Sequence, residues 1–121
     1  MSHDYEFTLP WPPSVNGYWR TFRNRQIISK RGREYKKDVK DVMILLKLDN
    51  ELVSDSIEFH MVINPPTLRK YDVDNFTKGV FDALSECNFW VDDEQVLKLT
   101  VVKGVKTKGG NVEVKINRTR V

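Results

Sequence analysis

The chain has one cysteine, two histidines and no long apolar run, and each shortage excludes a class of protein. The single Cys87 cannot form an internal disulfide, so a disulfide scaffold is excluded and a reducing compartment is expected. Two histidines are too few for an imidazole metal site, and no Cys-His or Ser-His arrangement supports covalent catalysis. No apolar run reaches the length of a membrane span, and the N-terminus lacks the regions of a secretory signal. We therefore expect a cytoplasmic protein without a membrane partner.

Length and composition favour a single globular domain over residues 1–121. Apolar residues make up 40% of the chain and charged residues 31%, as in ordinary soluble proteins. A chain of this length builds one core, and is too short for a catalytic domain plus a separate binding domain.

Positive charge is concentrated in one segment. Residues 17–40 contain nine Lys and Arg against Glu34 and Asp38, a net charge of +7, although the whole chain carries only +3. Such a segment is typical of a surface that binds a polyanion, although a solvated helix face with a basic loop would look the same. The candidate DNA-binding residues in this segment are Arg20, Arg23, Arg25, Lys30 and Arg31.

Four aromatic residues surround the arginine-rich loop at the start of this segment. They are Trp11, Tyr18, Trp19 and Phe22. Aromatic side chains beside arginines can stack on nucleic acid bases, whereas aromatic side chains beside prolines commonly form a small satellite core. The sequence leaves both interpretations open.

Apolar periodicity predicts an α+β fold. Alternating residues predict strands, helical spacing predicts helices, and residues 14–25 are expected to form an irregular loop. Gly109-Gly110 is a hairpin turn signal, and Ser29 is a candidate helix N-cap. The expected architecture is a mixed sheet of four to five strands with two helices on one face. The expected strands cover 4–9, 26–29, 57–63, 97–101 and 112–116, and the helices 30–48 and 75–87.

Acidic residues lie at both ends of the second expected helix. Asp72 and Asp74 precede it, Asp92 and Asp93 follow it, and Lys78 lies on its first turns. Clustered carboxylates suit Mg²⁺ or Mn²⁺, and such a site in a protein with a basic segment suggests chemistry on phosphodiesters. Three simpler interpretations remain: an aspartate N-cap, an exposed Asp74–Lys78 ion pair and a polar turn at 92–94.

Several motifs together resemble the RusA-type Holliday junction resolvases. The similar segments are Leu9-Pro10-Trp11-Pro12-Pro13-Ser14, Asp72-Val73-Asp74-Asn75 with Lys78, Phe81-Asp82-Ala83-Leu84, Phe89-Trp90, Asp92-Asp93, Val102-Lys103 and Thr107-Lys108-Gly109-Gly110. No single motif is decisive, but their order and spacing are specific. The resemblance covers nearly the whole chain.

The resemblance implies a Mg²⁺-dependent homodimer that nicks four-way DNA junctions symmetrically in recombination and repair, with Mn²⁺ as a possible substitute. It places the catalytic and metal-binding carboxylates on Asp72, Asp74 and Asp93, and the essential lysine on Lys78. It also expects a basic residue near the site, which Arg69 supplies.

The sequence leaves open the roles of Lys70, Glu94 and the Phe89-Trp90 pair. Lys70, beside Arg69, is a further candidate for gripping DNA phosphates. Glu94 is a departure from the family pattern and is either a competing ligand or a supporting acid. The Phe89-Trp90 pair is a candidate dimer contact or a core pair.

Two other functions compete with this interpretation. In a non-catalytic nucleic-acid-binding module, the acids would be only caps and turns. A metal-dependent phosphatase or nucleotidyltransferase would need an enclosed pocket that a short chain has little material to build.

Overall fold

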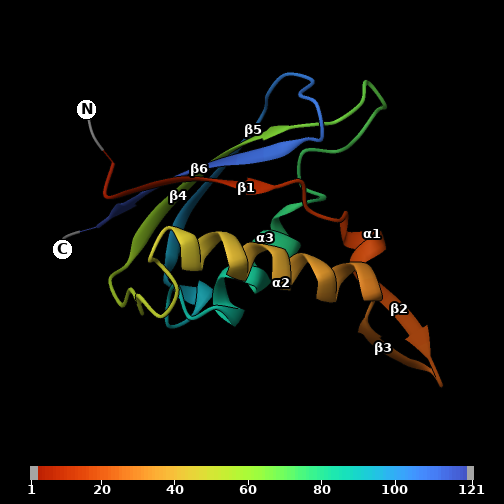
Figure 1. Ribbon diagram of the computed structural model, residues 1–121, viewed down its shortest axis with the longest axis horizontal. Helices are drawn as coiled ribbons and strands as arrows, with labels where there is room; N and C mark the ends of the chain where they lie inside the picture. The colour runs from red at the N-terminus through yellow and green to blue at the C-terminus, as the bar shows by residue number, and fades with distance from the viewer. Residues whose placement is uncertain (1–2, 120–121) are drawn as a thin grey trace.

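A computed structural model describes residues 3–119, and its main feature is a four-stranded sheet covered on one face by two helices (Figure 1). The sheet strands are β1 (Tyr5–Pro10), β4 (Ile57–Asn64), β5 (Val96–Lys103) and β6 (Asn111–Arg118). The long helices are α2 (Lys30–Leu45) and α3 (Thr77–Glu86). The remaining elements are the one-turn helix α1 (Val15–Tyr18), a hairpin of β2 (Trp19–Phe22) and β3 (Arg25–Ile28), and the 3-10 turn η1 (Asp93–Gln95). The expected α+β class and the helices on one face are confirmed.

The sheet is mixed because its strands run in both directions. The strand order is β1-β6-β4-β5, with β4 and β5 parallel and the other neighbours antiparallel. The parallel pair needs a crossover connection, which α3 provides.

The core lies between the helices and the inward face of the sheet. Alternate residues of β4, from Ile57 to Ile63, are buried, as are the inward residues of β6. Helix α2 contributes Tyr35, Val39 and Met43 at helical spacing. Ser29 caps α2, since its Oγ accepts the Gly32 N–H at 3.0 Å. The predicted cap of this helix is confirmed.

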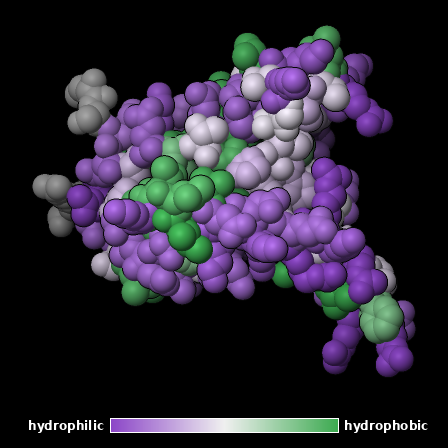
Figure 2. All heavy atoms as spheres, in the orientation of Figure 1, coloured by the Kyte–Doolittle hydropathy of each residue, from purple (hydrophilic) through white to green (hydrophobic). Residues whose placement is uncertain are grey.

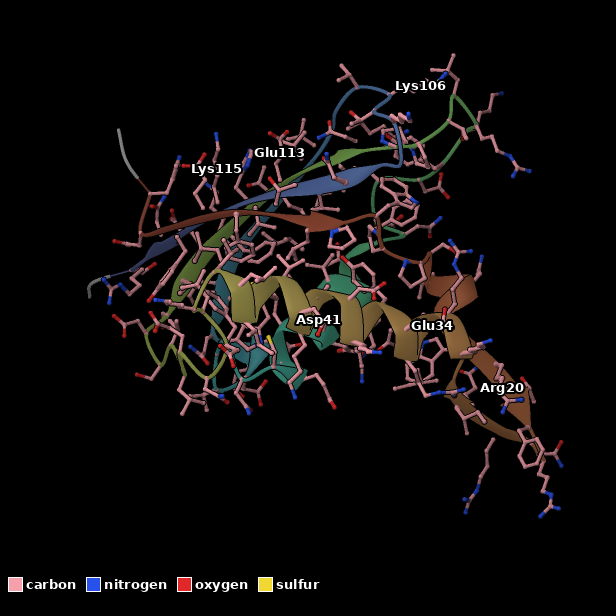
Figure 3. The ribbon with its side chains drawn as sticks, viewed as in Figure 1. Arg20, Glu34, Asp41, Lys106, Glu113 and Lys115 are labelled. Carbon is pink, nitrogen blue, oxygen red and sulfur yellow. The ribbon has the colours of Figure 1, made fainter. Side chains whose placement is uncertain are left out.

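The other face of the sheet is polar. Glu113 and Lys115 of β6 point away from the helices (Figure 3). On the helix side, Figure 2 shows a mainly hydrophilic surface with an apolar patch over the C-terminal end of α2, where Leu45 is 83% exposed. No helix within residues 3–119 is long and apolar enough to cross a membrane.

Several predicted details of the sheet are wrong. Gly109-Gly110 does not close a hairpin, because β5 and β6 are separated by β4 in the sheet. The expected inward face of β5 is only partly covered, since Leu97 is 63% exposed and Leu99 is 43% exposed on an edge strand. Phe89 and Trp90 are fully buried, so this pair belongs to the core and is not available as a dimer contact.

The predicted irregular loop at 14–25 is also wrong, because it contains α1 and β2. Strand β2 pairs with β3 in an antiparallel hairpin whose central residues, Arg23 and Asn24, have φ angles of 50° and 61°. Two left-handed central residues define the tight turn that matches the twist of paired strands. The turn was missed because arginine is not a residue that signals this geometry.

Candidate active site

Two backbone hydrogen bonds hold the loop before α3 in place. The Val15 N–H of α1 donates to the Asn75 carbonyl at 2.7 Å, and the Asn75 N–H donates to the Asp72 carbonyl at 3.2 Å. Asp72 and Asp74 are exposed at the surface of this loop. The N-cap of α3 is Phe76, with no side-chain capping bond. The interpretation of either aspartate as a helix cap is therefore wrong, and both carboxylates remain available to a ligand.

An aromatic cluster supports the same loop. The Trp11 ring lies 4.6 Å from that of Phe76 and 6.3 Å from that of Tyr71, measured between centroids. The Lys103 ammonium, at the end of β5, lies 4.6 Å from the Tyr71 ring centroid, which is a cation–π contact. These contacts place a lysine from a distant strand beside the loop that carries Asp72.

An open hollow of about 480 Å³ lies next to Asp72. It is lined by Arg69, Lys70, Tyr71, Asp72, Asn75 and Lys103. Three cationic side chains around one carboxylate suit a phosphate oxygen better than a neutral ligand. The hollow is a groove-like surface and lacks the enclosure that a small-molecule substrate needs.

Lys78 lies on α3 and forms an ion pair with Asp82. Its Nζ is 3.2 Å from the Asp82 carboxylate, and the Tyr18 hydroxyl donates to the same carboxylate at 2.9 Å. The predicted Asp74–Lys78 pair is not among the ion pairs formed within residues 3–119. Burial and the bond to Asp82 raise the pKa of Tyr18, so the hydroxyl stays a donor. Lys78 is therefore oriented by a partner on its own helix, with its charge still half exposed.

The turn after α3 is rigidly capped. The Asp92 carboxylate accepts the Glu94 N–H at 3.0 Å, and the Gln95 side-chain oxygen accepts the Asp92 N–H at 2.7 Å. Gln95 also donates to the Val53 carbonyl at 2.7 Å. The polar-turn interpretation is thus right for Asp92, which has a structural role. Asp93, the first residue of η1, is partly buried.

Asp93 lies among other charged groups. Partial burial raises the pKa of its carboxyl, and the adjacent Asp92 raises it further through a hydrogen bond and its charge. The charge of Asp82 acts in the same direction, while that of Lys78 opposes it. The turn and α3 therefore form one electrostatic cluster. Crowded carboxylates of this kind are stabilised by an added cation.

The donor chemistry fits a hard divalent cation, but the predicted ligands do not converge. Within residues 3–119, no three His, Cys, Asp or Glu side chains lie close enough together to hold a metal ion. The structure brings Lys78, Asp82 and Asp93 together and leaves Asp72 and Asp74 on the neighbouring loop. Joint ligation by Asp72, Asp74 and Asp93 requires the loop and the turn to approach each other.

The basic segment reaches the site through the base of the hairpin. The Lys78 ammonium lies 5.7 Å from the Trp19 ring centroid, at the first residue of β2. Arg20, Arg23 and Arg25 extend along the hairpin from there, and Arg20 is labelled in Figure 3. Lys30 and Arg31 are exposed at the start of α2, where Lys30 makes a surface ion pair with Glu34 at 3.8 Å. Trp19 therefore links Lys78 to the hairpin that carries Arg20, Arg23 and Arg25.

Sequence reasoning missed three residues of this region as site residues. Asp82 and Tyr18 orient Lys78, and Lys103 completes the basic hollow. Asp82 follows Lys78 at helical i,i+4 spacing, so the sequence held a signal for that pair. Lys103 belongs to the family-like Val102-Lys103 segment, but its spacing gave no sign of its place near the loop, because the pairing of β4 with β5 carries it there.

The chain is similar in sequence to known proteins along most of its length. The family described as "Endodeoxyribonuclease RusA" matches residues 10–117. A crossover junction endodeoxyribonuclease of Enterobacteria phage HK97 is 39% identical over 114 residues, which cover 94% of each chain. Those of Shigella sonnei (strain Ss046) and Escherichia coli (strain K12) are 44% identical over 115 residues, covering 93% of this chain and 92% of the relative.

Proposed function

Because this chain belongs to the RusA family of endodeoxyribonucleases, we propose that it nicks four-way DNA junctions by metal-dependent hydrolysis of phosphodiesters. The observation that carries the proposal is the contact of Lys78 with Trp19, which joins the acidic cluster to the basic hairpin in one surface. Since the relatives come from bacteria and phages, the proposed location is the cytoplasm of a bacterial cell.

The proposed mechanism begins with a phosphate held over the site. Arg69, Lys70 and Lys103 bind phosphate oxygens in the hollow beside Asp72. Lys78, oriented by Asp82, faces the phosphorus and stabilises the negative charge that develops in the transition state. Asp72, Asp74 and Asp93 would hold Mg²⁺, with Mn²⁺ as a substitute. The bound ion lowers the pKa of water and neutralises phosphate charge.

The direct test is a gel assay on synthetic four-way junctions, one mobile and one fixed, in Mg²⁺ or in EDTA. We expect paired nicks in Mg²⁺ and junction binding without nicking in EDTA. Binding without nicking in Mg²⁺ and in Mn²⁺ would support the non-catalytic module instead. Inhibition by nucleotides, but not by junction DNA, would support the small-molecule phosphatase.

The basic hairpin is expected to dominate the salt dependence of DNA binding. Replacing Arg20, Arg23 and Arg25 together by glutamine should weaken binding to all duplex substrates, because three phosphate contacts are lost. The slope of log K against log salt should fall by about one unit for each contact. Filter binding at several salt concentrations measures the slope. As a control, Lys106→Gln with Lys108→Gln removes two charges from the loop between β5 and β6. An unchanged slope in the arginine variant would place DNA elsewhere.

We also propose that the protein is a homodimer. One chain supplies one acidic cluster, whereas resolution of a junction needs two nicks related by a two-fold axis, which a C₂ dimer matches. Exposed apolar side chains on the edge strand β5, Leu97 and Leu99, and Leu45 at the end of α2, are surfaces that a second copy can bury. Light scattering at micromolar concentration checks the mass.

A mixed dimer tests whether each copy of the chain cuts one strand of the junction. A dimer of one wild-type chain and one Asp74→Asn chain should nick one strand of the junction without resolving it, because only one site is intact. Differently tagged chains purified in tandem supply the mixed dimer, and denaturing gels count the nicks. Paired cuts by the mixed dimer, or by a protein that scatters as a monomer, would contradict the dimer proposal.

A further inference from the structure

The β2–β3 hairpin projects away from the body of the protein and has an aromatic side chain at its tip. In Figure 1 it extends beyond the N-terminal end of α2, and Figure 2 shows some apolar surface among hydrophilic atoms near its end. Phe22 is 49% exposed and precedes the turn formed by Arg23 and Asn24.

Phe22 differs from the other aromatic residues of the basic region. Tyr18 is fully buried and Trp11 packs on Phe76, so these two belong to the support of the fold. The Trp19 ring is half-buried and packs edge-on against Tyr18. Stability of the core therefore explains the other three side chains and gives no reason for a phenylalanine at position 22.

The surroundings of Phe22 are cationic. The guanidinium of Arg20 lies 5.6 Å from its ring centroid and that of Arg23 lies 5.3 Å away. Residues 19–28 contain three arginines and no acidic residue. A like-charged hairpin of a second copy would repel this tip, whereas a polyanion is attracted to it. The charge thus favours DNA as the partner of the ring.

A four-way junction has a place where a base pair can expose its face to an aromatic ring, and continuous duplex DNA does not. Within each arm the bases are stacked on one another, so their faces are covered. At the branch point the terminal base pair of an arm can lose its stacking neighbour and expose a face, on which an aromatic side chain stacks. A projecting arm of this kind reaches the branch point while the body holds the phosphates.

From these observations we propose that Phe22 stacks on an exposed base pair at the branch point while Arg20 and Arg23 bind the flanking phosphates. This inference rests on the proposed junction substrate and adds a source of structural selectivity to it. The acidic cluster cuts, and the hairpin tip distinguishes a junction from linear duplex.

The test measures stacking in EDTA, where binding occurs without cleavage. A junction with 2-aminopurine at the branch point is titrated with wild-type protein, Phe22→Ala and Phe22→Trp, and affinity for linear duplex is measured in parallel. Phe22→Ala should abolish the fluorescence change at the branch point and weaken junction binding about 5- to 150-fold, since one base–aromatic stack is lost. Its affinity for linear duplex should stay at the wild-type value, and Phe22→Trp should behave as wild type.

The matched control is Thr21→Ala, an exposed neighbour on the same strand. Circular dichroism verifies that each variant is folded. The proposal is overturned if Phe22→Ala gives the wild-type fluorescence change, loses junction and duplex affinity equally, or changes mass in light scattering. Junction nicking by the wild-type protein in Mg²⁺ is scored separately. A failure of the stacking proposal is therefore distinguishable from a failure of the nuclease function.

Discussion

Replacing Asp72, Asp74 or Asp93 singly by asparagine is expected to abolish nicking while junction binding is retained. An amide oxygen is a poor ligand for a hard divalent cation, and removal of a negative charge does not weaken the attraction of DNA. Loss of even an indirect partner of a metal ligand costs about 10- to 100-fold, so loss of a direct ligand should exceed that range. Single-turnover cleavage in Mg²⁺, with binding measured in EDTA, separates the two effects.

Two substitutions serve as controls for this prediction. Asp41→Asn makes the same chemical change at an exposed position of α2 and should be silent. Asp92→Asn should also retain activity, because an asparagine oxygen can still accept the Glu94 N–H that caps the turn. Near wild-type cleavage by any of the three predicted variants would remove that aspartate from the site. Loss of cleavage by Asp92→Asn would show that Asp92 does more than cap the turn.

Lys78→Ala is expected to lower the cleavage rate far more than the affinity for DNA. A positioned cation that acts on developing charge is worth about 10²- to 10³-fold in rate, whereas its contact with the ground-state phosphate is one among many. Single-turnover rates at saturating protein give the chemical step, and equilibrium binding in EDTA gives the affinity. An equal loss in both would reduce Lys78 to an ordinary phosphate contact.

The ion pair with Asp82 supplies the control for Lys78. Asp82→Asn removes the charge partner of Lys78 but keeps an oxygen that can accept the Tyr18 hydroxyl. If the lysine acts on the substrate, Asp82→Asn should retain much more activity than Lys78→Ala. If the two variants lose the same activity, the ion pair itself is what matters.

The sequence predicted those elements whose signal is local. Strand β4 alternates strictly between buried and exposed positions along most of its length, and α2 begins at its predicted Ser29 cap. The hairpin predicted at Gly109-Gly110 is wrong because glycine indicates a turn in the backbone but not which strands pair. Gly109 and Gly110 do have left-handed φ angles of 78° and 71°, but the strands that they connect are not neighbours. The hairpin at Arg23 was missed because its turn has left-handed backbone geometry but contains no glycine to signal it.

The sequence predicted on which segments the candidate site residues lie, but not how they are arranged in space, and their roles stay a prediction. Asp72 and Asp74 lie on the loop before α3 and Lys78 lies on its first turn, as their spacing predicted. Two relations depend on contacts between distant segments, namely the burial of Asp93 near Asp82 and the approach of Lys103 to Tyr71. Periodicity within a segment contains no information about such contacts, so the sequence alone could not supply them.

The position of β6 has a consequence for the synthesis of this protein. Strand β6 lies between β1 and β4, so both earlier strands lack their shared neighbour until residues 111–118 have been synthesised. Pairings between the two ends of a chain also form slowly, because a long loop must close first. A nascent chain on the ribosome can therefore expose its arginine-rich hairpin but cannot hold the loop and turn that carry the acids in place.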